Sequence, residues 1–225
     1  MNRFTRRLLA VLLFLQAAGA YAATWSEGTH YVRLTPVQQT TVPHGKVEVL
    51  EVFSYGCPAC NGFQPVMAKL RASLPTNAQL VYLPASFVPA EDWPMFQRAY
   101  IAAELLGIAE RTHQAMYDAV WKTGELATSD YATHQLKSPQ PSIEQAAALY
   151  ARVGGVSPQQ FLAMAKSFGV DSRMRAADAQ ILAMRVESTP TLIVNGKYRV
   201  VRDSVKNNDE LIELVKYLIA RESGG

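Results

Sequence analysis

The chain has only two cysteines, Cys57 and Cys60, among its 225 residues. A zinc site built on them would also need histidine ligands. The chain has four histidines, and no two of them have the spacing of a ligand pair: His30, His44, His113 and His134. A c-type haem site would need a histidine directly after Cys60, where the chain has Asn61. A structural disulfide across two intervening residues closes too small a loop to stabilise the fold much. Redox chemistry is therefore favoured over all three alternatives.

The N-terminal segment lacks a hydrophobic run long enough to cross a membrane. Its apolar stretch, Leu8–Leu15, is shorter than the ~20 residues that a membrane-spanning helix needs. Arg3, Arg6 and Arg7 precede this stretch, and Ala20-Tyr21-Ala22 follows it. This order is typical of a secretory signal peptide. We expect residues 1–22 to be cleaved on export, which leaves a protein of the periplasm without a membrane segment.

The expected mature chain also lacks an excess of either charge. Three of the 22 basic residues lie in residues 1–22, which leaves 19 basic against 19 acidic residues in a chain of 203. Nothing in this balance favours nucleic acid or an anionic membrane as a partner. Export implies an oxidising compartment, yet this chain has a single cysteine pair rather than a scaffold of disulfides. The cysteine pair is thus interpreted as the working part of the molecule.

The residues around the cysteines predict a strand that leads directly into a helix. Residues 47–54 are rich in β-branched, aliphatic and aromatic residues, which is typical of a strand buried on both faces. Ser54, Tyr55 and Gly56 would form a turn, and Pro58 suits the first turn of a helix. Cys57 would then lie at the helix N-terminus, where free N–H groups and the helix dipole stabilise a thiolate. We expect an exposed Cys57 that attacks and a buried Cys60 that resolves the mixed disulfide.

The segments that flank this unit predict further strands. Tyr31–Leu34 is interpreted as a short edge strand, and Leu80–Leu83 as a second buried strand that Pro84 ends. Thr191–Val194 and Lys197–Val201 flank Asn195-Gly196, which is a strong hairpin signal. A last amphipathic helix follows, with Asn207 and Glu210 as its predicted cap.

The middle of the chain has helical periodicity and no strand signal. Ser142 and Ser157, each with a glutamine three residues later, predict capped helix starts. We expect His113 in the core or at its boundary, and a long loop over Gly124–Pro141. Residues Phe161, Met164, Ala165 and Phe168 share one predicted apolar face, and a separate helix is expected over Asp171–Arg185.

The order of elements predicts an α/β fold: a thioredoxin fold with an inserted all-helical domain. A strand–helix–strand start and a strand–strand–helix end resemble the two halves of that fold. The predicted thioredoxin-like domain comprises residues 23–90 and 176–225, and the inserted helical domain comprises residues 91–175.

Three motifs resemble the DsbA family of periplasmic thiol–disulfide oxidoreductases: VLEVFSYGCPAC, FQRAYIAAELLGI and STPTLIVNGKY. The resemblance extends over nearly the whole chain after residue 22. It implies that Cys57 is the nucleophile, Cys60 the resolving thiol and Pro190 a cis-proline that faces them. Thr189 would offer backbone groups to an extended substrate. Glu51 matches the acidic residue that assists proton movement at the buried thiol.

The chain departs from the best-known family members at a few positions. Ala59 replaces a histidine in the dipeptide between the cysteines, and Pro58 and Ala59 are expected at the substrate-binding surface with Thr189. Because the Ala59 methyl group has no hydrogen-bond donor, we expect a less oxidising pair than in histidine-bearing members. Gln64 and Tyr82 stand where some members have charged residues near Glu51, and the loop over Gly124–Pro141 is long for the family.

These observations predict an enzyme that introduces disulfide bonds into secreted proteins through Cys57 and Cys60. Reduced secreted proteins would be its substrates, and a membrane quinone-linked oxidase of the DsbB kind would reoxidise it. The expected protein is a monomer without a metal or cofactor. Two alternatives remain: a disulfide reductase or isomerase, and a non-catalytic peptide-binding or chaperone-like module of thioredoxin fold.

Overall fold

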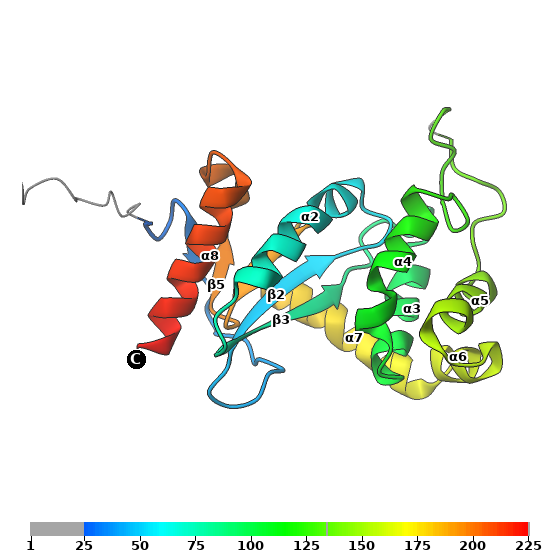
Figure 1. Cartoon of the computed structure of the whole chain (residues 1–225), viewed down its shortest axis with the longest axis horizontal. Coiled ribbons are helices and arrows are strands. Elements are labelled where there is room, and N and C mark those ends of the chain that lie inside the picture. Colours follow the sequence, from blue (N-terminus) through cyan, green and yellow to red (C-terminus); the bar gives the residue numbers. More distant parts are fainter. Residues whose placement is uncertain (1–24, 134, 225) are drawn as a thin grey trace, which may run out of the picture.

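A computed structural model describes residues 25–133 and 135–224, so the predicted signal peptide at residues 1–22 lies outside the described part. Its centre is one five-stranded sheet (Figure 1). The strands lie in the order β1 (Tyr31–Arg33), β5 (Tyr198–Val200), β4 (Thr191–Val194), β2 (Val47–Phe53) and β3 (Ala78–Pro84). Strands β2 and β3 are parallel, and the other neighbours are antiparallel. The predicted strand–helix–strand start and closing hairpin are thus confirmed.

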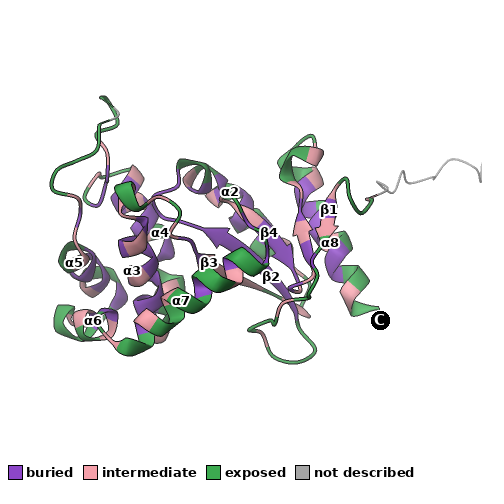
Figure 2. Cartoon of the chain, turned by 180° about the vertical axis from the view of Figure 1, so that it is seen from behind, coloured by how far each residue is buried: buried purple, intermediate pink, exposed green. Residues whose placement is uncertain are grey.

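Strand β2 is buried on both faces, as its apolar run predicts, because helices cover each side of the sheet. Val47 and Val49 pack with helices α2 (Pro58–Ser73) and α8 (Asn208–Ser223). Leu50 and Val52 face the other way and pack with helix α7 (Phe168–Ala183), which crosses the opposite face of the sheet in Figure 2. The cysteines follow the end of this buried strand.

Strand β3 is not the second buried strand that its sequence predicts. It lies at the edge of the sheet and most of its residues are half-buried, whereas β1 is an edge strand as expected. An apolar run does not distinguish a central strand from an edge strand, because an edge strand can also carry apolar side chains on both faces while one side of its backbone stays uncovered. Pro84 is the last residue of β3, a position that an edge strand tolerates.

A group of helices covers the end of the sheet near the cysteines. It comprises α3 (Trp93–Leu105), α4 (Ala109–Trp121), α5 (Ile143–Gly154) and α6 (Pro158–Ala165). A short 3₁₀ turn, η1 (Pro89–Glu91), precedes this group, and a second one, η2 (Arg202–Ser204), follows β5. Ser142 and Ser157 form the predicted capping boxes with Gln145 and Gln160. The segment between α4 and α5 is a loop, as predicted, and Tyr131 in it stacks on Trp121. No helix of the described residues is long and apolar enough to span a membrane.

The prediction that Phe168 shares one apolar helix face with Phe161 and Met164 is wrong. Helix α6 ends at Ala165, and the Ser167 hydroxyl accepts a hydrogen bond from the Val170 N–H at 3.3 Å, which starts a new helix. Phe168 is therefore in the first turn of α7, where 79% of it is exposed. The helical spacing continues across this break, so periodicity alone does not reveal the change of direction.

Helix α7 is one continuous helix that contacts both parts of the molecule. Met174 packs on the helical group, whereas Ile181 packs on the sheet. The helix starts at Phe168 rather than at the predicted Asp171, and it passes through residue 175. The division into residues 91–175 and the flanking segments stays a prediction, with its second boundary inside this helix.

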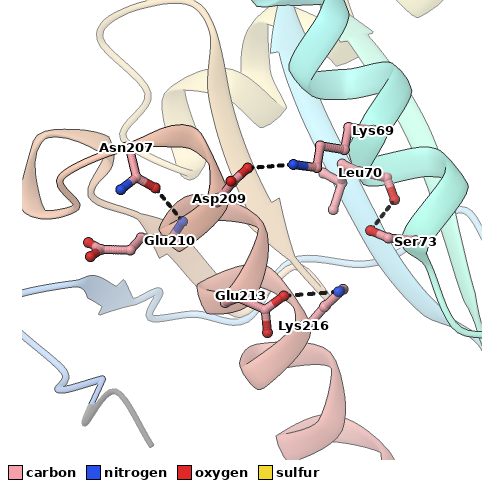
Figure 3. Close-up of polar contacts among 8 residues, drawn as sticks. All are labelled: Lys69, Leu70, Ser73, Asn207, Asp209, Glu210, Glu213 and Lys216. Atoms are coloured by element: carbon pink, nitrogen blue, oxygen red, sulfur yellow. Dashed lines mark hydrogen bonds and ion pairs between the residues drawn. The ribbon is translucent and has the colours of Figure 1, made fainter. Parts of the chain in front are cut away.

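The C-terminal hairpin and helix follow their sequence signals. Asn195 and Gly196 have φ values of 55° and 61°, as a tight hairpin turn requires. Figure 3 shows the start of α8, where the Asn207 Oδ1 atom accepts a hydrogen bond from the Glu210 N–H at 2.9 Å. In the same view, an ion pair of 2.6 Å between Lys69 and Asp209 links α2 to α8.

Replacing Gly196 with alanine should destabilise the protein more than the same change at Gly124. Both glycines have positive φ, which costs an alanine about 1–2 kcal/mol. A Cβ atom on Gly124 would meet nothing within 4 Å, whereas one on Gly196 would lie 2.2 Å from the Gln38 carbonyl oxygen. Urea unfolding of the two variants measures the difference. Equal losses of unfolding free energy would contradict the close approach of Gln38.

Candidate active site

Cys57 is the N-cap residue of α2, as the sequence predicts. Its backbone is extended, with φ −85° and ψ 115°, and Pro58 occupies the first turn of the helix. The Cys57 sulfur accepts a hydrogen bond from the Cys60 N–H at 3.2 Å. The sulfur thereby takes the place that an oxygen has in an ordinary N-cap, at the positive end of the helix dipole.

Side chains from the helical group hold the turn before Cys57. The Trp121 indole N–H donates to the Tyr55 carbonyl oxygen at 2.7 Å, and the Tyr55 hydroxyl is 2.9 Å from His113 Nδ1. A Cβ atom on Gly56 would lie 2.6 Å from Trp93 Nε1, so the turn has no room for a side chain there. His113 is buried, as predicted. Sequence analysis missed the roles of Trp93 and Trp121, because no local motif connects them to a turn so distant along the chain.

The prediction that Cys57 is exposed was wrong, since only 4% of the residue is accessible. It packs with the buried aromatic residues where the sheet meets the helical group. The pKa of the Cys57 thiol is nevertheless lowered to about 6. The largest cause is a hydrogen bond from the Cys60 thiol. Burial acts in the opposite direction and raises the pKa. Further hydrogen bonds lower it, from the Thr189 side chain and from the N–H groups of Cys60 and Ala59.

Cys60 is fully buried one turn further into the helix, as predicted. Burial is the largest cause that raises the pKa of its thiol, and the hydrogen bond to Cys57 raises it further. At neutral pH, Cys57 is therefore the thiolate and Cys60 retains its proton. This difference between two neighbouring sulfurs is what a nucleophile and a resolving thiol require.

Thr189 and Pro190 face the cysteines from the segment before β4. The peptide bond between them is cis, which is the isomer that the resemblance implies. The Cys57 Sγ atom is 3.4 Å from the Thr189 carbonyl oxygen. Both residues are half-buried, and Pro58 and Ala59 are exposed. The fold thus joins residues that are 132 positions apart into one surface around the Cys57 sulfur.

Glu51 lies in the middle of β2, between Tyr82 of β3 and Leu192 of β4. It is fully buried, so its carboxylate does not reach water. Neither carboxylate oxygen has a hydrogen-bond partner among the described residues. Burial, followed by the negative charge of Cys57, raises the pKa of Glu51 to about 8. Glu51 is therefore able to take up or release a proton near neutral pH.

Glu48, three residues earlier on the same strand, is buried in a different way. Its carboxylate accepts hydrogen bonds from the Thr41 N–H at 2.6 Å and from the Thr41 hydroxyl at 2.9 Å. This comparison shows that the absence of partners at Glu51 is a property of that site and not of the whole strand.

The two uncharged replacements near Glu51, Gln64 and Tyr82, lie on helix α2 and strand β3. The Gln64 side chain donates to the Cys60 carbonyl oxygen at 3.3 Å. The Tyr82 hydroxyl accepts a hydrogen bond from Arg71 at 3.3 Å. Tyr82 and Arg71 line a groove of about 500 Å³ that contains neither cysteine.

A second groove, of about 270 Å³, lies directly beside the cis-proline. Ala59 and Phe63 of α2 line it, together with the segment from Ser188 into β4, residues of β5 and η2, and Leu211 of α8. Thr189, Pro190 and Ala59 thus share one surface, while Pro58 lies outside the groove lining. We call this depression the Pro190 groove.

The fold and the site together define a thioredoxin-fold protein with a dithiol centre. A strand–turn–helix unit carries the two cysteines at a helix N-terminus, and the segment with the cis-proline lies against them. Among residues 25–133 and 135–224, no cluster of three or more potential metal ligands was found.

Comparisons with known proteins agree with this class. A thioredoxin family model matches residues 42–216. The thiol:disulfide interchange protein DsbA of Pseudomonas aeruginosa is 32% identical over 222 residues, which cover 99% of this chain and 97% of that protein. DsbA of Pseudomonas syringae pv. tomato is 31% identical over 217 residues, which cover 96% and 92%.

Solved structures give the same result. The crystal structure of the oxidoreductase DsbA from Xylella fastidiosa matches with a TM-score of 0.73 and 32% identity, over 87% of this chain and 96% of that one. Pseudomonas aeruginosa DsbA matches with a TM-score of 0.71 and 30% identity, over 88% and 94%. The chain belongs to the DsbA family of thiol:disulfide interchange proteins, as its motifs predict.

The ultraviolet absorbance of the reduced protein should show a Cys57 thiolate that titrates near pH 6. Cys60→Ala should raise this pKa because the variant lacks the thiol that donates to Cys57. Relative to Cys57→Ser, the reduced protein should gain unfolding free energy as the pH rises from about 6 to 9, since the thiol of the unfolded chain keeps its proton up to about 9. A titration near that of free cysteine would remove the basis for the nucleophile assignment.

Glu51→Gln should stabilise the protein at pH 8 and have little effect near pH 4.5. The pKa of Glu51 is raised on folding from 4.5 to about 8, so its contribution to stability is complete at low pH and is lost as the pH rises through this window. We expect a gain of roughly 2–4 kcal/mol at pH 8 in urea unfolding. Glu48→Gln is the matched control and should destabilise, because it weakens the hydrogen bonds from Thr41. A loss of stability at pH 8 in Glu51→Gln would mean that the carboxylate has a stabilising partner.

Proposed function

We propose that the protein is a periplasmic oxidoreductase that introduces disulfide bonds into exported proteins. The observation that carries this proposal is the difference between the two sulfurs: a low-pKa Cys57 at a helix N-terminus and a buried, protonated Cys60. Family membership supports the same reaction class, since the relatives are named thiol:disulfide interchange proteins.

The reaction consists of two thiol–disulfide exchanges. In the oxidised enzyme, a substrate thiolate attacks the Cys57 sulfur, forms a mixed disulfide and displaces Cys60 as the leaving thiolate. A second substrate thiolate then attacks the substrate sulfur of the mixed disulfide and releases Cys57. The substrate loses two electrons and gains a disulfide, and Cys57 and Cys60 are left reduced.

Glu51 is proposed to supply the proton that the buried Cys60 needs when it leaves. A thiolate in this buried position is strongly disfavoured, and a neutral carboxylic acid is available nearby because the pKa of Glu51 is raised to about 8. When the enzyme is reoxidised, the carboxylate would take the proton back.

Thr189 and Pro190 are proposed to hold the substrate beside Cys57. Backbone groups before β4 can pair with an extended segment by main-chain hydrogen bonds, which select little for sequence. Pro58 and Ala59 would complete the contact surface. For reoxidation we propose a membrane quinone-linked oxidase of the DsbB kind, as the resemblance implies. We also propose that the enzyme is a monomer.

Cysteine variants test the proposed function. Oxidised wild-type protein should oxidise a reduced dithiol peptide, and Cys57→Ser should lose this activity completely. Cys60→Ser is tested with the oxidised form of the same peptide: its Cys57 thiolate should attack the peptide disulfide, release one peptide sulfur as a thiolate and form a mixed disulfide. This species cannot be resolved by Cys60, and mass spectrometry detects it. An activity that survives in Cys57→Ser would favour a binding or chaperone-like module. Net reduction of the peptide disulfide in an oxidising glutathione buffer would favour a reductase.

A further inference from the structure

The Pro190 groove contains two arginines without an acidic partner. Arg199 of β5 and Arg202 of η2 both line it, together with Asp203. Among the described residues, neither arginine takes part in an ion pair, although eight ion pairs occur elsewhere in that part of the chain. Two cations and one carboxylate leave the groove with an excess of positive charge.

The two arginines have different surroundings in the groove. The Arg199 Nε atom is buried and has no hydrogen-bond acceptor among the described residues. A buried donor without an acceptor is costly, so a bound group that accepts this hydrogen bond would be favoured. The Arg202 guanidinium lies 4.8 Å from the centre of the Phe63 ring, a cation–π contact that orients it while it stays exposed.

The groove is continuous with the surface that faces Cys57. It includes Ala59, Thr189 and Pro190, and the Thr189 carbonyl oxygen is 3.4 Å from the Cys57 sulfur. A polypeptide whose cysteine reaches Cys57 can therefore place a neighbouring segment in the groove, beside Arg199 and Arg202. Planar guanidinium groups match carboxylates in geometry as well as charge.

We propose that Arg199 and Arg202 select substrate segments that carry an acidic side chain close to the reacting cysteine. This inference rests on the proposed function, because it concerns the substrate of the same site. Main-chain pairing at Thr189 would accept many sequences, and the two arginines would favour those that carry an acidic side chain near the cysteine.

Three reduced dithiol peptides that differ only in the residues flanking the first cysteine test the proposal. These residues are glutamate, glutamine or lysine. The glutamate peptide should be oxidised about two- to fivefold faster than the glutamine peptide, and the lysine peptide more slowly, as expected for partly exposed ion pairs. The differences should shrink at high salt. Equal rates for the three peptides would overturn the proposal and leave the proposed function intact, whereas no oxidation of any peptide would defeat the proposed function.

Variants then assign the effect to the groove. Arg202→Gln should reduce the preference for glutamate, the double variant with Arg199→Gln should abolish it, and Asp203→Asn should increase it. Arg175→Gln is the matched control: Arg175 is also exposed, lies over an aromatic ring (Phe168) and has no ion pair among the described residues, but it is on α7, outside the groove. It should leave the preference unchanged. Oxidation of reduced dithiothreitol, which has no side chain that could contact the groove, measures the dithiol reactivity of each variant, and the peptide rates are compared after division by it.

A preference that persists in the double variant, or that falls equally in Arg175→Gln, would refute the assignment to the groove. If Arg199→Gln fails to fold, Arg202→Gln still decides the question, because Arg202 is exposed and its replacement removes no buried contact other than the face of Phe63.

Discussion

Hydrogen bonds to the Cys57 sulfur are the interaction on which the rest of the structure depends. They come from the thiol and N–H of Cys60, the N–H of Ala59 and the Thr189 side chain. The N–H groups are available because α2 begins directly after Cys57, and the Trp121 indole holds the turn before it. A thiolate can therefore be stabilised without the donor side chain that the dipeptide lacks at Ala59.

The charge of the Cys57 sulfur also affects the ionisation of Glu51 in strand β2. An anionic Cys57 and an ionised Glu51 repel each other in a buried site, so each proton that leaves one group makes the other harder to ionise. Burial, without a hydrogen-bond partner for either carboxylate oxygen among the described residues, keeps Glu51 neutral at pH values where an exposed glutamate is charged. The active site thus lowers the pKa of Cys57 and raises that of Glu51. The buried carboxyl group of Glu51, which has no hydrogen-bond partner among the described residues, costs the fold stability.

Local sequence signals predicted those parts of the molecule that depend on neighbouring residues. The apolar run of β2, the helix start at Pro58, the serine caps and the turn at Asn195-Gly196 were all confirmed. The errors concern properties that distant parts of the chain decide. The burial of Cys57 depends on packing by the helical group, and the exposure of β3 depends on its place in the sheet. Arg199 and Arg202 were not foreseen, since only the tertiary fold places them beside Pro190.

Helix α7 determines how modular this fold is. An excision of residues 91–175 would remove the first half of α7 and leave only residues 176–183 of it against the sheet. A helix of about two turns is marginal without its own continuation, and Leu50 and Val52 would lose a reliable cover on that face of the sheet. The helical group is therefore not a cassette that can be removed or exchanged at its sequence boundaries. A functional transplant would have to include the whole of α7 and the sheet face on which it rests.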